Sequence, residues 1–171
     1  MAAVGCTTET TVEPAVAKPP STDASVRLVW WKEIPGLVPA ELARDYQRFP
    51  YRFSLFGDGT VIYRDEEFQG RRVQLRPAEL AELWSRVQQF RAVSLSDAAL
   101  PEPMRGGTVI LDAGHEEFGV HEPDGDQSLS VDLALPYWRR EFPDHEGLAR
   151  WSQLRQLIVS FDHPRAEVWS P

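Results

Sequence analysis

The chain has 171 residues, of which 42% are hydrophobic and 26% are charged, and it carries a net charge of −8. This composition is ordinary for a globular protein with one domain and a tail, and no apolar run approaches the about 18 residues that cross a membrane. Basic residues occur at most in adjacent pairs, so this acidic chain is not expected to bind nucleic acid.

Residues 7–25 are rich in Thr, Pro, Ala and Ser and contain no aromatic residue. Such a segment cannot bury enough apolar surface to offset the entropy that is lost on folding. We therefore expect a disordered tether over residues 1–25 and a single folded domain over residues 26–171.

The only cysteine, Cys6, excludes an internal disulfide and a cysteine-based zinc cluster. The Ala3–Cys6 stretch resembles the end of a bacterial lipoprotein signal, in which small residues precede a cysteine that becomes lipidated. Ala3 stands where such signals usually carry Leu, and the charged and apolar regions of a signal do not precede it. We expect Cys6 to be a lipidation site, with the signal lying upstream of Met1 or removed. The alternative is a free cysteine in a cytosolic terminus.

The first half of the domain predicts a hairpin and a long helix with clear local signals. Two alternating strands flank Gly57-Asp58-Gly59, and glycine supplies the positive φ that a tight turn requires. The helix begins at Pro77, and its apolar residues recur at three- and four-residue spacing. The expected elements are a strand over 25–34, a helix over 39–49, a hairpin over 51–64, a strand over 71–76 and a helix over 77–91.

The second half repeats the order hairpin, strand, helix. A hairpin over 106–123 is expected to turn near Ala113-Gly114, and alternation over 128–135 predicts a strand. Asp144 is the expected N-cap of the last helix, and residues 166–169 predict a terminal strand. These elements predict a two-layer α+β domain, in which two amphipathic helices pack on one face of a mostly antiparallel sheet.

Two stretches of the first half resemble a family of uncharacterised bacterial envelope proteins, many of which are lipoproteins: FPYRFSLFGDGTVIYR (49–64) and VQLRPAELAELWSRVQQF (73–90). In that family, a strand with Tyr or Phe leads into a Gly-Asp-Gly-Thr-Val turn, a short strand and a helix with an acidic start. Family members often carry cysteines before the first hairpin strand, where this chain has Pro35-Gly36 and Phe49-Pro50, so such a disulfide cannot form here. The resemblance implies an envelope location and this fold, and it brings no catalytic residues.

The sequence contains no phosphate-binding loop, nucleophile elbow or zinc-protease motif. His115, Glu117 and His121 would share one face of a strand, but the two histidines would stand about 20 Å apart along it, too far to bind one metal ion. The acidic runs 65–67 and 122–126 are interpreted as charged turns and not as calcium sites. We expect no catalytic residue, cofactor or metal site; an enzyme with His115 or His121 as its base is an alternative.

Aromatic residues are the remaining candidates for a site, because six tryptophans are many for this length. Trp30 and Trp31 are adjacent in a predicted strand and must face opposite sides, so one of them is expected to be exposed. Tyr137, Trp138 and Arg139 fall in the predicted linker before the last helix and are of the types enriched in binding hot spots. In the alternative interpretation, these aromatic side chains are covered or pack onto the core.

These features predict a non-enzymatic domain that is located in the bacterial cell envelope or secreted and is tethered through its N-terminus. The domain is expected to bind a protein partner, with membrane contact only through a lipid anchor on Cys6. The alternative is a cytosolic, immunity-type interaction protein whose acidic surface neutralises a basic partner.

Overall fold

The computed structural model describes residues 18–91, 101, 114–132 and 135–171. Its strands form one seven-stranded sheet in the order β6-β5-β1-β2-β3-β4-β7, in which every neighbouring pair is antiparallel. The strands are β1 (Arg27–Ile34), β2 (Tyr51–Phe56), β3 (Thr60–Arg64), β4 (Gly70–Gln74), β5 (His115–Glu122), β6 (Gly125–Asp132) and β7 (Glu167–Val168). Cys6 with most of the expected tether, and the strand expected before Gly114, lie outside the described residues.

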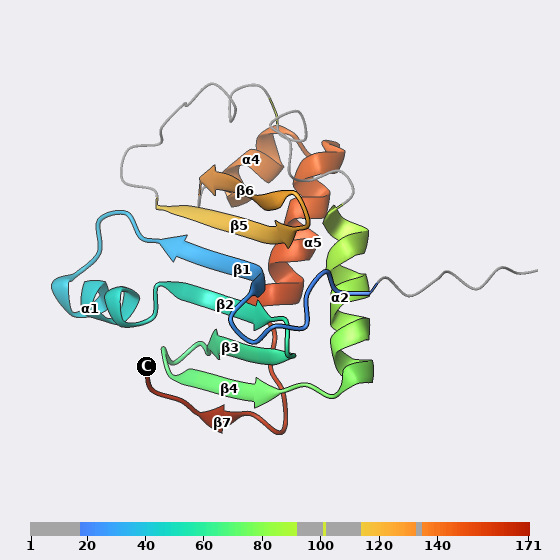
Figure 1. Cartoon of the computed structure of the whole chain (residues 1–171). Coiled ribbons are helices and arrows are strands. Elements are labelled where there is room, and N and C mark those ends of the chain that lie inside the picture. The colour runs from blue at the N-terminus through green and yellow to red at the C-terminus, as the bar shows by residue number, and fades with distance from the viewer. Residues whose placement is uncertain (1–17, 92–100, 102–113, 133–134) are drawn as a thin grey trace, which may run out of the picture.

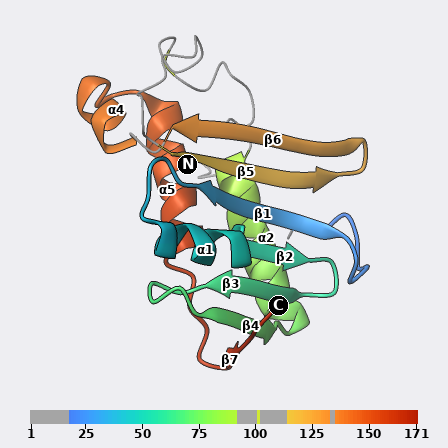
Figure 2. The ribbon, with the colours of Figure 1, turned by 90° about the vertical axis from the view of Figure 1, so that its left-hand side faces the viewer.

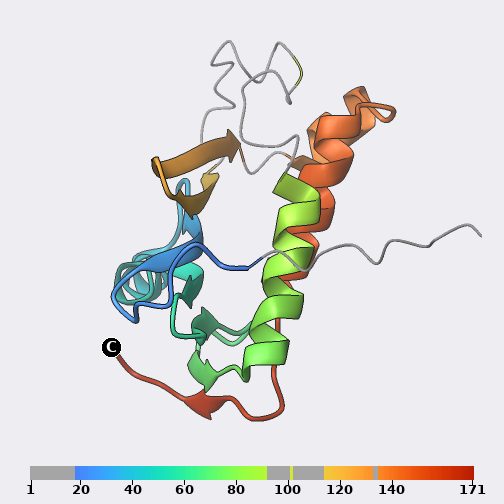
Figure 3. The same ribbon diagram turned by 45° about the vertical axis from the view of Figure 1, so that its right-hand side comes forward.

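Four helices accompany the sheet in the described part of the chain: α1 (Ala40–Arg48), α2 (Pro77–Arg91), α4 (Leu135–Glu141) and α5 (Glu146–Val159). α2 and α5 lie side by side on one face of the sheet, as Figure 3 shows in a view along the strands. α1 lies away from them, in front of the sheet in Figure 2. The predicted α+β fold is therefore confirmed (Figure 1). None of the described helices combines the length and the apolar composition that a bilayer crossing requires.

The first hairpin forms as its sequence predicts. Gly59 has φ +86°, a value that residues with a side chain rarely adopt. The Asp58 carboxylate supports the turn, because it accepts hydrogen bonds from the amide of Thr60 at 2.8 Å and from its hydroxyl at 2.9 Å. The register pairs Phe53 with Tyr63, and both side chains are buried on the face that α2 and α5 cover.

The core lies between the sheet and the two long helices. Trp31 of β1 packs against Trp151 of α5 with ring centroids 5.2 Å apart, and Phe118 of β5 contacts both rings. The helices bury the residues that recur at helical spacing. These residues are Leu83, Trp84 and Val87 in α2, and Leu148, Trp151, Leu154, Leu157 and Ile158 in α5.

A buried arginine holds α1 against the strand ends. Arg64 at the end of β3 is 2% exposed, and its guanidinium lies 4.6 Å from the ring centroid of Tyr46 in α1 and 4.3 Å from that of Phe68. The same guanidinium forms an ion pair with Glu33 of β1. Arg64 therefore joins α1, the loop after β3 and the end of β1, since each supplies one of its partners.

The second hairpin turns within the acidic run 122–126, which was interpreted from the sequence as a charged turn. β5 and β6 pair up to Glu122↔Gly125, so this turn lies at Pro123-Asp124, whereas Ala113 of the other expected turn lies outside the described residues. Gly125 has φ +124° in this turn. The Pro-Asp-Gly sequence favours a chain reversal here. As a result, β6 begins before the predicted strand and ends at Asp132.

The cap of the last helix also differs from the prediction. His145, and not Asp144, is the N-cap of α5, and its Nδ1 accepts a hydrogen bond from the Leu148 amide at 3.4 Å. A histidine nitrogen thus takes the role that a carboxylate oxygen was expected to have at this end.

Both described ends of the chain pack on the sheet. Before β1, the Gly57 amide donates a hydrogen bond to the Val26 carbonyl at 2.9 Å, and a Cβ at Gly57 would lie 2.6 Å from the carbonyl oxygen of Asp23. After α5, the chain passes round the edge of the sheet, where β7 pairs with β4, and the Trp169 ring lies 6.1 Å from that of Phe49. The chain ends on the side of the sheet opposite α2 and α5 (Figure 3).

Candidate functional site

The two adjacent tryptophans of β1 face opposite sides of the sheet. Trp31 is fully buried among the residues that pack on α5, whereas Trp30 is partly exposed on the other face. The alternation that the sequence predicts therefore separates the two indoles. Trp31 belongs to the core, and Trp30 is the one that a ligand can reach.

Trp30 lies directly over a glycine of the neighbouring strand. The register pairs it with Gly119 of β5, and a Cβ placed on Gly119 would lie 1.9 Å from two carbon atoms of the indole. Only a residue without a side chain leaves room for the ring at this point. The sheet itself therefore fixes the position of the Trp30 indole.

A hollow surrounds this indole, and we call it the Trp30 groove. It has a volume of about 490 Å³ and lies on the face of Trp30, opposite the face on which Trp31 packs against α5. Its lining residues are Ser25, Val26, Arg27, Trp30, Tyr51, Phe56, Glu117, His121 and Asp126. The groove therefore combines aromatic rings with charges of both signs.

Arg27 provides the cationic part of the Trp30 groove. Its guanidinium lies over the Tyr51 ring, 4.0 Å from the centroid, and 5.5 Å from the centroid of Phe56. Its Nε is buried and has no hydrogen-bond partner, and no carboxylate of the described residues forms an ion pair with it. The aromatic rings thus hold this cation while leaving its hydrogen-bonding capacity unused.

Glu117 and Asp126 provide the acidic part of the groove, and His121 lies beside them. Glu117 and His121 flank Gly119 on the same face of β5, because residues two apart in a strand share a face. His121 Nδ1 lies 2.7 Å from Asp126 Oδ1 of β6, so these two side chains satisfy each other. Glu117 has no hydrogen bond or ion pair among the described residues.

The second set of predicted binding residues lies in a helix and not in a linker. Trp138 of α4 is 5% exposed and stacks on Phe142, with ring centroids 6.2 Å apart and planes inclined by 25°. The prediction of an accessible aromatic loop is therefore wrong for Trp138, because its ring is used to pack α4 onto α5. Arg139 is half-buried in the same helix, and the side chain of Tyr137 lies outside the described residues.

The histidines of β5 stand apart, as the strand geometry predicts. His115 and His121 lie near opposite ends of β5, while Phe118 and Val120 face the core. Glu116 faces the core as well and is 1% exposed. In the part of the chain that the structure describes, no three His, Cys, Asp or Glu side chains are grouped in a way that could hold a metal ion.

The first acidic run organises the turn between β3 and β4. Asp65 Oδ1 accepts hydrogen bonds from the amides of Glu67 at 3.0 Å and Gln69 at 2.8 Å, and Oδ2 accepts one from Arg71 Nε at 3.0 Å. Partial burial by itself would raise the pKa of the Asp65 carboxyl, but these hydrogen bonds together hold that pKa below its ordinary range. Asp65 is therefore committed to the turn and is not free to bind a ligand.

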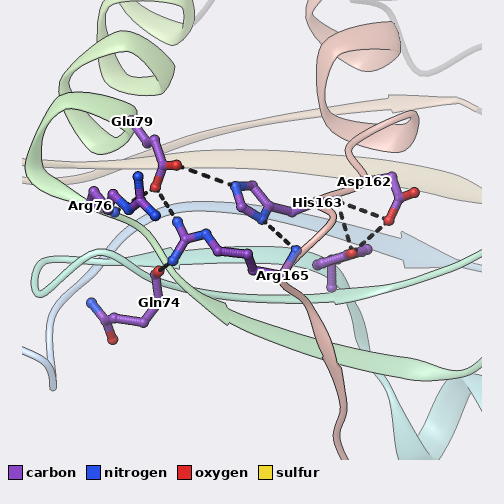
Figure 4. Close-up of polar contacts among 7 residues, drawn as sticks. Gln74, Arg76, Glu79, Asp162, His163 and Arg165 are labelled. Carbon is purple, nitrogen blue, oxygen red and sulfur yellow. Dashed lines mark hydrogen bonds and ion pairs between the residues drawn. The ribbon is translucent and has the colours of Figure 1, made fainter.

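A polar cluster fastens the C-terminal segment to the start of α2 (Figure 4). Glu79 Oε2 accepts a hydrogen bond from the Arg76 amide at 2.7 Å, which completes the acidic half of a capping box, and the same oxygen pairs with Arg165. These interactions lower the pKa of Glu79, and the hydrogen bond from the Arg76 amide contributes most.

His163 belongs to the same cluster. Its Nε2 lies 3.7 Å from Glu79 Oε1, and its Nδ1 accepts a hydrogen bond from the Arg165 amide at 3.2 Å. Because the Arg165 amide occupies the lone pair of Nδ1, this nitrogen of His163 is not free to act as a base.

Tyr63 connects this cluster to the sheet. Its hydroxyl donates a hydrogen bond to Asp162 Oδ1 at 2.9 Å and accepts one from the His163 amide at 3.3 Å. Burial, together with the bond to Asp162, raises the pKa of Tyr63 to about 12. The phenol therefore stays protonated as a structural donor, and the cluster positions the chain after α5.

Sequence analysis proposed Trp30 and Trp31 together as binding candidates without deciding between them, and it did not identify Arg27, Tyr51 or Phe56. Arg27, Tyr51 and Phe56 come together only through the pairing of β1 with β2. One local signal was available: Gly119 is a lone glycine inside a strand pattern, which often marks a close approach of another group.

Comparisons with protein-family models, with curated proteins and with solved structures found no match to this chain.

Proposed function

We propose that this chain is a non-enzymatic binding domain of the bacterial cell envelope, or a secreted one, which is held by its N-terminal segment and binds a protein partner through the Trp30 groove. The observation that carries the proposal is the partly exposed Trp30 indole, which rests on Gly119 beside the unpaired guanidinium of Arg27. Trp, Tyr and Arg are the residue types that contribute most to binding energy at protein interfaces.

Two further observations support a binding role over catalysis. The groove residues are held by strands and by ring contacts, so they offer a preformed surface that loses little entropy on binding. Among the described histidines, His163 has its Nδ1 occupied by a hydrogen bond from the Arg165 amide, and His115 and His121 lie near opposite ends of β5. The proposal therefore assigns the groove to recognition and assigns no residue to a reaction.

Selection of a random peptide-display library on the folded domain tests the binding role. We expect the selected peptides to bind the Trp30→Ala variant at least about tenfold more weakly than the wild type, since the indole is the centre of the groove. Leu37→Ala is the matched control: Leu37 is 81% exposed in the loop before α1, so its loss should leave the affinity unchanged. Peptides that bind Trp30→Ala as tightly as the wild type would contradict the proposal.

The envelope location is supported by the Ala3–Cys6 stretch and by the composition of residues 7–25. Expression from the gene with its upstream DNA, in bacteria fed an alkyne-bearing fatty acid, tests it. We expect the wild type to carry the label in the membrane fraction and the Cys6→Ser variant to carry none. An unlabelled wild type in the cytosolic fraction would favour the alternative of a cytosolic interaction protein.

A further inference from the structure

We infer that the Trp30 groove recognises a peptide segment with two opposite charges, whose carboxylate pairs with Arg27 and whose basic side chain lies against Trp30 and Glu117. This inference rests on the proposed binding function and adds the chemistry of the ligand. It follows from three groups on one surface: the Arg27 guanidinium and the Glu117 carboxylate, neither of which forms an ion pair among the described residues although Lys32 lies opposite Glu117, and the accessible Trp30 indole.

Arg27 lacks the partner that a guanidinium in this setting needs. Its Nε is removed from water without a hydrogen-bond acceptor, and such a donor loses the hydration that it has in the unfolded chain. The stack on Tyr51 and Phe56 fixes the plane of the guanidinium. A carboxylate in that plane would accept two parallel N–H bonds from the two terminal nitrogens, since the buried Nε is out of a ligand's reach; an arginine offers this geometry and a lysine does not.

Glu117 and Trp30 form a receptor for a cation. Glu117 is next but one to Gly119 on β5, and Gly119 lies under the Trp30 indole, so the carboxylate stands beside the ring. A Lys or Arg side chain placed there would contact the face of the indole and the carboxylate together. Asp126 is bonded to His121 through Oδ1 at 2.7 Å, so Glu117 is the carboxylate of the groove that forms no such bond.

The mixture of charges selects against ligands of one sign. A polyanion would place negative charge next to Glu117 and Asp126, and a polycation would place positive charge next to Arg27. A segment with one acidic and one basic group meets neither penalty. The carboxylate can come from an Asp or Glu side chain or from the C-terminus of the partner, and both sources offer the same chemistry.

NMR titration of the isotope-labelled domain with short blocked peptides tests the inference. The first peptide carries Glu and Lys separated by alanines; in two control peptides, Gln replaces either the Glu or the Lys. A fourth peptide has Gln in place of Glu and a free C-terminal carboxylate. The indole N–H of Trp30 and the Nε–H of Arg27 report binding at the groove itself.

We expect the Glu–Lys peptide to bind about fivefold more tightly than either control peptide. The Arg27→Gln variant should lose the preference for Glu and keep that for Lys, and Glu117→Gln should show the reverse. Arg27→Lys, which keeps the charge without the planar fork, should retain part of the preference for Glu. Full affinity of the fourth peptide would also support the inference and would identify a C-terminus as the carboxylate source.

Two results would overturn the inference. One is that the charge preferences persist unchanged in Arg27→Gln and Glu117→Gln; the other is that the Trp30 indole resonance does not move at about 10 mM peptide. A failure of this inference can be distinguished from a failure of the proposed binding function. Display-selected peptides that need Trp30 but neither charge would leave the binding role standing and remove only the charge assignment.

Discussion

Arg155 of α5 and Glu116 of β5 form an ion pair across the two layers of the domain, in which one N–H of the arginine is shared by both carboxylate oxygens. Arg155 Nε lies 2.8 Å from Glu116 Oε1 and 3.0 Å from Oε2. The glutamate is 1% exposed, and the arginine reaches it from a partly exposed position. Burial raises the pKa of Glu116, and Arg155 opposes that rise. The negative charge of Glu116 therefore depends on the presence of Arg155.

Replacing Arg155 with Met should leave this carboxylate buried without a partner. We expect a loss of about 1–3 kcal/mol in the free energy of unfolding at neutral pH, measured by urea denaturation. Without Arg155, the pKa of Glu116 in the folded state lies further above its unfolded value. A carboxyl whose pKa is raised by folding stabilises the folded state below its unfolded pKa, and this contribution is lost as pH rises through the folded pKa. The loss of stability in Arg155→Met, relative to the wild type, should therefore become smaller on acidification. The double variant Glu116→Gln, Arg155→Met should show no such recovery.

Gly119→Ala should displace the Trp30 indole, because the new methyl group would occupy the position of the ring. We expect a loss of about 1–3 kcal/mol in stability and a shifted Trp30 signal in fluorine NMR of the fluorotryptophan-labelled protein. The control is Gly119→Ala combined with Trp30→Ala, which removes the clash. If the double variant is destabilised by the sum of the two single effects, the contact between the two residues is not the cause.

Trp84→Ala should be among the costly substitutions, because this indole of α2 is 3% exposed within the core. A loss of about 3–5 kcal/mol in the free energy of unfolding is expected from the cavity that remains. Leu37→Ala, at an exposed position, should change stability by less than about 0.5 kcal/mol. Equal losses for the two variants would contradict the burial of Trp84.

Tyr63 should make the domain sensitive to alkaline pH. Its pKa is raised from 10.0 to about 12 in the folded state, so the folded protein holds the phenol proton more tightly than the unfolded chain does. The resulting stabilisation is fully present below pH 10 and is lost as pH rises towards 12. Tyr63→Phe should cost about 1 kcal/mol at neutral pH through the lost bond to Asp162. The stability difference between wild type and variant, followed by urea unfolding, should narrow above pH 10; a constant difference would exclude this role.

Local signals account for the parts of the fold that the sequence predicts well. The Gly57-Asp58-Gly59 turn and the apolar spacing of α2 each act within one element, and the structure has the hairpin and the helix at the predicted residues. In the second half, the turn at Pro123-Asp124 determines the register of β5 and β6, and β6 begins at Gly125 and not at Ser128 as predicted. Helix α4 was not predicted because it is short and carries Pro136 near its start. A helix tolerates proline in its first turn, but in the sequence alone a proline indicates a loop.

The candidate site was only partly predictable for a related reason. Strand alternation showed that Trp30 and Trp31 must diverge, but which indole meets the helices depends on the pairing of β1 with β5. The contact of Arg27 with Tyr51 depends on the pairing of β1 with β2. This pairing has a register shift between Arg27 and Val29, which no local sequence pattern predicts. Contacts between distant segments therefore decide the chemistry of the groove.

The position of β1 has a mechanical consequence. Residues 18–26 lead directly into this strand, which lies inside the sheet and is hydrogen-bonded to β5 on one side and to β2 on the other. A pull along the axis of β1 from its N-terminal end loads both ladders in shear, so that many hydrogen bonds resist together. The force at which the domain unfolds depends on the unfolding rate, and hence on the free-energy barrier to breaking these hydrogen bonds. Because Trp30 belongs to the loaded strand, tension on the chain and occupancy of the groove would act on the same element.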